Sequence, residues 1–285
     1  MMRYLLCFPL LVLFYSCNND TSSTTITDHM VMVEDSTAEN SDDEQAEDSL
    51  LTEAETTITV DSSNLAPEPT GKIKLLLEGT FHKDEVWQGV QQKKWLALVF
   101  EEGQYVLKPV QATVKTVYDP AHDPDSLHIS GRAVSSSRPG TIVLLTGLSN
   151  PNPGKIDTVA LERDVLAPGH KISFKTSRGT YQLTASGDSA AVEGTNLFKI
   201  QNYSWKVSGN KAGSKVTQTL AEDHSFENAI YVLLWMGDLD GDGVQDIIAD
   251  LSTSRARNNI TLFLSSMAGK GKLYHQAASF EFTSH

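Results

Sequence analysis

Cysteine is scarce in this chain of 285 residues, which contains only Cys7 and Cys17. Both lie within the first 17 residues, so residues 18–285 offer no thiol for a disulfide, a catalytic nucleophile or a thiolate metal ligand. Long apolar runs are also missing. The longest apolar stretch, near the N-terminus, has about a dozen residues, whereas a membrane-spanning helix needs roughly 20.

Motifs for nucleophilic and zinc-protease catalysis are absent as well. The sequence has no Gly-x-Ser-x-Gly elbow and no His-Glu-x-x-His pair. A glycoside hydrolase stays open as an alternative, because two carboxylates on separate strands leave no local signature.

Positive charge is missing from residues 18–70, which hold 14 acidic residues and no Lys or Arg. Residues 71–285 hold 22 of each sign, so the net charge of -13 belongs to the acidic segment. That segment is rich in Ser and Thr and lacks aromatic residues, which predicts a disordered linker. The balanced charge of the remainder gives no indication of nucleic-acid binding.

Residues 1–17 have the composition of a signal peptide, with Arg3 before an apolar core that ends at Tyr15. The sequence Phe14-Tyr15-Ser16-Cys17 resembles a bacterial lipobox. This resemblance implies acylation of Cys17 and a lipid-anchored place in the cell envelope, on the periplasmic or the exposed side of the outer membrane. An ordinary cleaved signal peptide is the alternative.

Residues 71–285 alternate between apolar and polar side chains, as in Val110, Ala112 and Val114, and are interrupted by Pro and Gly at short intervals. This pattern predicts an all-β or mostly β domain, an antiparallel sandwich or irregular barrel. Tyr105 to Tyr118 is expected to form one long hairpin arm. Only Asp84 to Lys94 has helical character, and residues 186–195 leave open a division into two β domains.

One run near the C-terminus, residues 237–246, carries a definite chemistry. Its four carboxylates would repel one another unless a cation or water screened them. Gly243 permits the sharp turn of such a loop, and all the donors are oxygens, which favours calcium over softer metals. The flanking apolar runs are short and rich in β-branched residues, so a strand, a calcium loop over 238–246 and a second strand are predicted. The expected ligands are Asp238, Asp240, Asp242, the backbone carbonyl of Val244, and Asp246.

This loop is similar to the calcium loop of FG-GAP and VCBS-type repeats, whose pattern is Asp-x-Asp-x-Asp-Gly-x-x-Asp. An EF-hand is excluded, since the position that requires a bidentate Glu is Ala249. The related repeats occur once per blade in propellers, whereas this chain has one copy. An Asp- and Gly-rich turn that binds nothing is the alternative to a metal site.

Other polar and aromatic groups have simpler interpretations. A loop marked by two prolines carries five residues that could form a second metal site or an acid/base pair, but their spacing matches no known ligand signature and they are interpreted as solvated surface groups: Asp119, His122, Asp123, Asp125 and His128. The tryptophans are expected in the core rather than on a sugar-binding surface: Trp87, Trp95, Trp205 and Trp235. Arg255 and Arg257 are expected in a solvated loop.

These features together predict an envelope lipoprotein whose β domain binds one structural calcium ion and serves in binding or scaffolding. Its expected partners are the membrane, through the lipid, and an envelope protein or glycan. The competing hypothesis is a calcium-stabilised enzyme that acts on polysaccharide or another envelope substrate.

Overall fold

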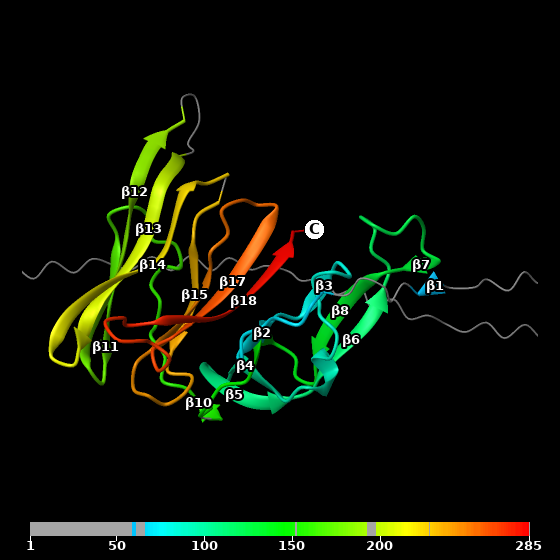
Figure 1. Cartoon of the computed structure of the whole chain (residues 1–285), viewed down its shortest axis with the longest axis horizontal. Coiled ribbons are helices and arrows are strands. Elements are labelled where there is room, and N and C mark those ends of the chain that lie inside the picture. The colour runs from blue at the N-terminus through cyan, green and yellow to red at the C-terminus, as the bar shows by residue number, and fades with distance from the viewer. Residues whose placement is uncertain (1–58, 61–65, 152, 193–197, 228, 285) are drawn as a thin grey trace, which may run out of the picture. The chain divides into compact units, whose positions relative to one another are not determined.

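The alternation of apolar and polar residues produces an all-β structure, as the sequence predicts (Figure 1). The computed structural model describes residues 59–60, 66–151, 153–192, 198–227 and 229–284. Within these ranges the only helix is a single 3₁₀ turn, η1 (Val90–Gln92), in the segment where helical character is expected. None of the described sheets closes into a barrel, which leaves the sandwich of the two expected architectures.

The described strands form five sheets, and every strand pair except the short β1–β7 pair is antiparallel. The five-stranded sheet has the order β10 (Gly154–Lys155), β5 (Gln104–Val110), β4 (Trp95–Glu101), β9 (Thr141–Thr146) and β2 (Lys74–Leu76). The three-stranded sheet has the order β3 (Gly79–Phe81), β8 (Gly131–Ser136) and β6 (Ala112–Val117).

Two four-stranded sheets and one strand pair complete the set. One sheet has the order β11 (Lys171–Thr176), β12 (Gly179–Ala191), β13 (Phe198–Lys211) and β14 (Ser214–Ser225). The other has the order β15 (Val232–Gly237), β16 (Asp246–Asp250), β17 (Arg257–Leu264) and β18 (His275–Thr283). The parallel pair consists of β1 (Thr59–Val60) and β7 (His128–Ile129).

The expected long hairpin forms only in part. Its turn lies at Glu102 and Gly103, whose φ angles of 49° and 77° give the left-handed conformation that tight hairpin turns need. The expected single arm from Tyr105 to Tyr118 is wrong, because Gln111 separates β5 from β6 and the two strands join different sheets. Alternation of side chains cannot reveal such a change of sheet, since the apolar face continues through it.

The β15–β18 sheet is buried on both faces, because its side chains alternate between two hydrophobic clusters. On β16, Ile248 packs with the cluster of the β2, β4, β5 and β9 strands, while Ile247 and Ala249 pack with the cluster of the β11–β14 sheet. On β17, Leu262 joins the first cluster and Phe263 the second. This sheet is therefore the layer that the two clusters share.

Ordered structure begins before the predicted domain start at Gly71. Thr59 and Val60 pair with β7, and the Glu68 carboxylate forms ion pairs with Lys74 at 3.2 Å and with Lys93 at 2.7 Å. The predicted signal peptide (1–17), Cys17 and most of the predicted linker (18–70) lie outside the described residues. Residues 54–285 form one compact unit, although residues 193–197, at the possible boundary, are not described.

No helix in the described part of the chain has the length and apolar character that crossing a bilayer requires.

Burial of both faces makes the β15–β18 sheet the most sensitive part of the core. We expect Leu262→Ala to lower the free energy of unfolding by about 2–5 kcal/mol, because the side chain is fully buried and a cavity would remain. The matched change Leu234→Ala, at an exposed position of β15, is expected to cost under about 0.5 kcal/mol. Urea denaturation measures both, and equal losses would contradict a shared central layer.

Candidate metal centre between β15 and β16

The aspartate-rich loop connects β15 to β16, so the predicted strand, loop and strand arrangement is confirmed. The two strands pair up to Gly237 and Asp246, which places the first and last residues of the loop side by side. The chain reverses over residues 238–245, and Gly241 and Gly243 adopt φ angles of 76° and 80° that only glycine takes readily.

Asp238 organises the backbone of the loop. Its Oδ1 accepts the N–H groups of Gly241 at 2.8 Å and Asp242 at 3.1 Å, and its Oδ2 accepts that of Gly243 at 2.9 Å. The same residue's own N–H donates to the carbonyl of Asp157 at 2.9 Å. One carboxylate therefore holds three successive amides and fixes the curvature of the loop.

Asp246 lies beneath the loop and is completely buried. Its Oδ2 accepts the N–H of Leu239 at 3.0 Å, and its Oδ1 accepts the N–H of Ser265 at 3.0 Å. Ser265 directly follows β17, and the antiparallel pairing of β16 with β17 brings it beside Asp246. Hydrogen bonds from these two amides offset only part of the free-energy cost of removing the Asp246 carboxylate from water.

Asp240 completes a group of three carboxylates. Oxygen atoms of Asp238, Asp240 and Asp246 lie within 4.8 Å of one another. The Asp240 Oδ2 accepts a hydrogen bond from the Ser266 hydroxyl, whereas its Oδ1 is buried and has no hydrogen-bond partner. A buried carboxylate oxygen without a donor is costly, and a cation would satisfy it.

The electrostatics of the group oppose ionisation in the absence of a cation. Burial raises the pKa of Asp246 well above its usual value, and the neighbouring charge of Asp240 raises it further. Burial likewise raises the pKa of Asp240, with additional repulsion from Asp242 and Asp238. A divalent ion would reverse both effects, because it favours the charged forms.

Asp242 and Val244 lie differently from the other predicted ligands. The Asp242 Oδ2 accepts the Ser265 hydroxyl at 2.6 Å and the Arg178 guanidinium at 3.1 Å, so Asp242 stands outside the group of three. Val244 donates its N–H to Asp242 Oδ1 at 2.8 Å and buries its side chain in the core. That the backbone carbonyl of Val244 is a metal ligand stays a prediction.

Residues far away in the sequence support the loop, and sequence reasoning missed them. The Ser177 N–H donates to the Gly243 carbonyl at 2.7 Å, and a Cβ at Gly243 would lie 2.5 Å from the Ser177 hydroxyl. The Tyr274 hydroxyl donates to the Gln245 carbonyl at 2.7 Å. No local signal marks these partners, because Ser177 reaches the loop from the β11–β14 sheet and Tyr274 directly precedes β18, 29 positions along the chain from Gln245.

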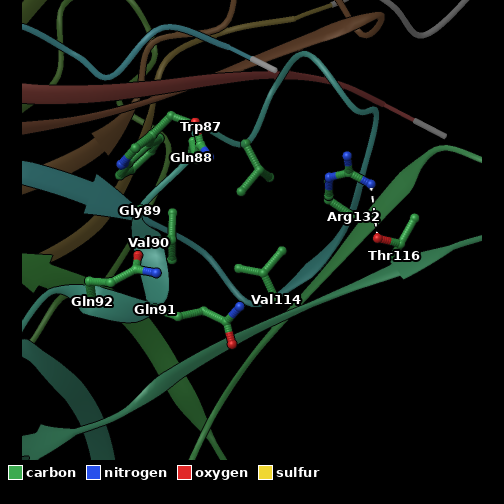
Figure 2. Close-up of a pocket in the computed structure, with 10 residues that line it drawn as sticks. Trp87, Gln88, Gly89, Val90, Gln91, Gln92, Val114, Thr116 and Arg132 are labelled. Atoms are coloured by element: carbon green, nitrogen blue, oxygen red, sulfur yellow. Dashed lines mark hydrogen bonds between the residues drawn. The ribbon is translucent and has the colours of Figure 1, made fainter. Parts of the chain in front are cut away.

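The expected core role of the tryptophans is confirmed, since all four are buried: Trp87, Trp95, Trp205 and Trp235. Trp87 lines a pocket of about 290 Å³ (Figure 2), in which the Arg132 guanidinium donates to the Thr116 hydroxyl at 3.2 Å. No carboxylate is among the ten residues that line this pocket, so it lacks the pair that glycoside hydrolysis needs. Arg255 is exposed in a turn, as expected for a solvated loop, whereas Arg257 is exposed but begins β17 rather than lying in the loop.

The interpretation of Asp119 as a solvated loop residue needs correction, whereas His122 is exposed as expected. Asp119 is buried, and the structure brings it together with His122 and with His82, which sequence reasoning missed. Asp125 and His128 remain exposed and pair with each other at 2.8 Å, as expected for a surface loop.

Comparisons with protein family models, with curated proteins and with solved structures found no match for this chain.

The raised pKa values predict an unusual pH dependence in the metal-free protein. A carboxyl whose pKa is higher in the folded than in the unfolded state contributes stability that is complete below about pH 4 and is lost as the pH rises through the folded pKa. In chelator, we therefore expect the Asp240 and Asp246 contribution to unfolding free energy to fall from acid toward neutral pH. Urea denaturation of the wild type and of Asp240→Asn at several pH values in this range isolates the contribution of Asp240. If the unfolding free energies of the two proteins changed in parallel with pH, the raised pKa of Asp240 would be contradicted.

Proposed function

We propose that the loop between β15 and β16 binds one structural calcium ion. The observation that carries the proposal is the convergence of Asp238, Asp240 and Asp246 oxygens within 4.8 Å of one another, and Asp240 also has a buried oxygen, Oδ1, that lacks a donor. The resemblance of the loop to the calcium loops of FG-GAP and VCBS-type repeats supports the same conclusion.

The chemistry of the surroundings favours calcium over other common ions. Oxygen is the only donor type in the group and in the adjacent hydroxyls of Ser265 and Ser266. Calcium accepts six to eight oxygens in flexible geometry, whereas zinc prefers nitrogen and sulfur. Asp242, which pairs with Arg178, is the predicted ligand that would have to turn toward the ion.

The expected stabilisation is modest. Calcium modules outside cells bind with dissociation constants of about 10⁻⁴ to 10⁻³ M, so about 1 mM calcium adds roughly 0.4 to 1.4 kcal/mol. The principal effect would be local, since the ion replaces repulsion among carboxylates at the end of the central sheet.

The broader proposal is an envelope lipoprotein, anchored through Cys17, whose β domain serves in binding or scaffolding. The lipobox-like sequence and the acidic segment that follows it support the anchor and a spacer. The expected partners are the outer membrane, through the lipid, and an envelope protein or glycan.

Asp240→Asn tests the ion site, because the difference in stability between the variant and the wild type should change sign when calcium is added. In chelator we expect the variant to be more stable than the wild type, because it removes a poorly solvated charge while keeping an acceptor for Ser266. In millimolar calcium we expect the order to reverse, because the variant loses a charged ligand. Thermal unfolding under both conditions measures the two differences.

Asp164→Asn is the matched control, because Asp164 is exposed and only its backbone carbonyl receives a described hydrogen bond, from Leu233. The control should change the melting temperature by the same small amount in calcium and in chelator. If calorimetry detects no calcium binding by the wild type, the proposed ion site is wrong whatever the variants do.

The lipid anchor is tested separately from the ion. We expect wild-type protein produced in a Gram-negative host to partition into detergent and to carry an acylated N-terminal cysteine by mass spectrometry, because lipidation adds buried methylene groups. Cys17→Ser should move the protein to the aqueous phase, while Cys7→Ser, within the predicted signal segment, should leave partitioning unchanged. A wild-type N-terminus without acyl chains would contradict the anchor.

A further inference from the structure

The three-stranded sheet brings two loops together at one of its ends. Strands β3 and β6 both pair with β8, and Phe81 and Thr116 both lie opposite Arg132. The two outer strands therefore run parallel and end at the same level. His82 follows β3 directly and Asp119 follows β6 by two residues, so both emerge at this end.

Asp119 is held as a buried acceptor. It is only 2% exposed, and its Oδ1 accepts the N–H of Ala121 at 3.0 Å. Asp123 closes the loop, since its Oδ2 accepts the N–H groups of Asp119 at 2.7 Å and Ser130 at 2.9 Å. Gly131 permits the close approach, because a Cβ there would lie 3.2 Å from that of Asp119.

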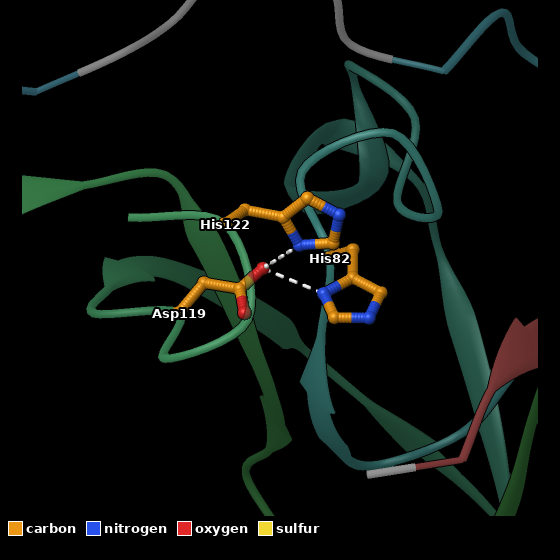
Figure 3. Close-up of side chains that lie close together, drawn as sticks. All are labelled: His82, Asp119 and His122. Carbon is orange, nitrogen blue, oxygen red and sulfur yellow. Dashed lines mark hydrogen bonds and ion pairs between the residues drawn. The ribbon is translucent and has the colours of Figure 1, made fainter. Parts of the chain in front are cut away.

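The Oδ2 of Asp119 faces two imidazoles (Figure 3). The Nδ1 atoms of His82 and His122 lie 2.6 Å and 2.9 Å from it, and the two rings meet edge to face with centroids 4.2 Å apart. Burial alone would raise the pKa of Asp119, but hydrogen bonds from His82, Ala121 and His122 outweigh it and lower the pKa. The carboxylate is therefore charged and directed at two nitrogens.

His82 and His122 differ in exposure to solvent. His82 is buried, and its turn is fixed by Glu85, whose carboxylate accepts the N–H of His82 at 2.9 Å and that of Thr283, on β18, at 2.6 Å. The His122 side chain is 54% exposed, so one member of the group faces water. The arrangement thus combines two buried groups, His82 and Asp119, with one ring that is open to solvent.

We propose that His82, Asp119 and His122 form a second metal site, which binds a divalent transition metal ion such as Zn²⁺. Two imidazole nitrogens and one carboxylate oxygen are a set of three ligands that zinc accepts, with a fourth position left for water. This site is distinct from the aspartate loop, whose donors are all oxygen.

The geometry requires only a small adjustment. Ligands at about 2.0–2.1 Å from a tetrahedral ion lie roughly 3.3 Å from one another, so the His82–Asp119 distance must open by about 0.7 Å and the His122–Asp119 distance by about 0.4 Å. Rotation of the half-exposed His122 ring supplies the smaller change, and the larger one requires a shift of the buried His82 and Asp119 side chains. Each neutral imidazole then carries its proton on Nε2 and presents the Nδ1 lone pair to the ion.

Zinc titration of the full-length chain in detergent, with calcium at saturation to occupy the aspartate loop, tests the proposal. We expect one Zn²⁺ per chain by calorimetry. His122→Gln should weaken binding roughly 100-fold or more, since loss of a direct ligand costs at least as much as loss of a supporting group. His122 is exposed enough that its replacement should not prevent folding, unlike that of His82.

His128→Gln is the matched control, because this histidine lies in the same loop and pairs with an exposed Asp125. It should leave zinc binding unchanged. Co²⁺ provides a second measurement, since the visible bands of a tetrahedral site should appear in the wild type and in His128→Gln but not in His122→Gln. Absence of zinc binding by the wild type, or equal affinity in wild type and His122→Gln, would show a hydrogen-bonded cluster without a metal and overturn the proposal.

Discussion

Burial of both faces of the β15–β18 sheet is the constraint on which the rest of the structure depends. The β11–β14 sheet and the sheet that contains β2, β4, β5 and β9 each bury one face against it. The β11–β14 sheet leaves its other face largely to solvent, as antiparallel sheets commonly do, whereas β2, β4 and β9 bury successive residues and are covered on both faces as well. The shared sheet must therefore be apolar on both sides, which explains the nearly unbroken apolar run of β16.

The aspartate loop is positioned by this same sheet. Asp246 is the first residue of β16, so the strand that enters the core carries a carboxylate at its buried end. Such a charge opposes the burial that the sheet requires, unless amides and a cation balance it. The amides of Leu239 and Ser265 provide part of that balance, and the remaining deficit is the physical reason to expect an ion.

The sequence predicts the loop well because its signal is local. Alternating aspartates, two glycines and flanking β-branched runs all lie within about two dozen residues, and the strands formed where expected. The His82 group shows the opposite case. His82 and Asp119 are 37 positions apart and meet because β8 pairs with both β3 and β6, a register that no local pattern encodes. The loop with two prolines alone favours the solvated interpretation over a second metal site, because His82 lies outside it.

The two acidic groups differ in how their charge is balanced, and this difference separates their chemistry. Asp119 is surrounded by donors, so burial does not prevent its ionisation, and its nitrogen partners suit a softer ion. Asp240 and Asp246 face other carboxylates, which together with burial raise the pKa of both. Hydrogen bonds therefore balance the charge of Asp119 without a metal, whereas the aspartate loop has mutual repulsion that a hard cation would relieve. Removal of an ion from the proposed calcium site should consequently disturb the local structure more than removal of one from the proposed zinc site.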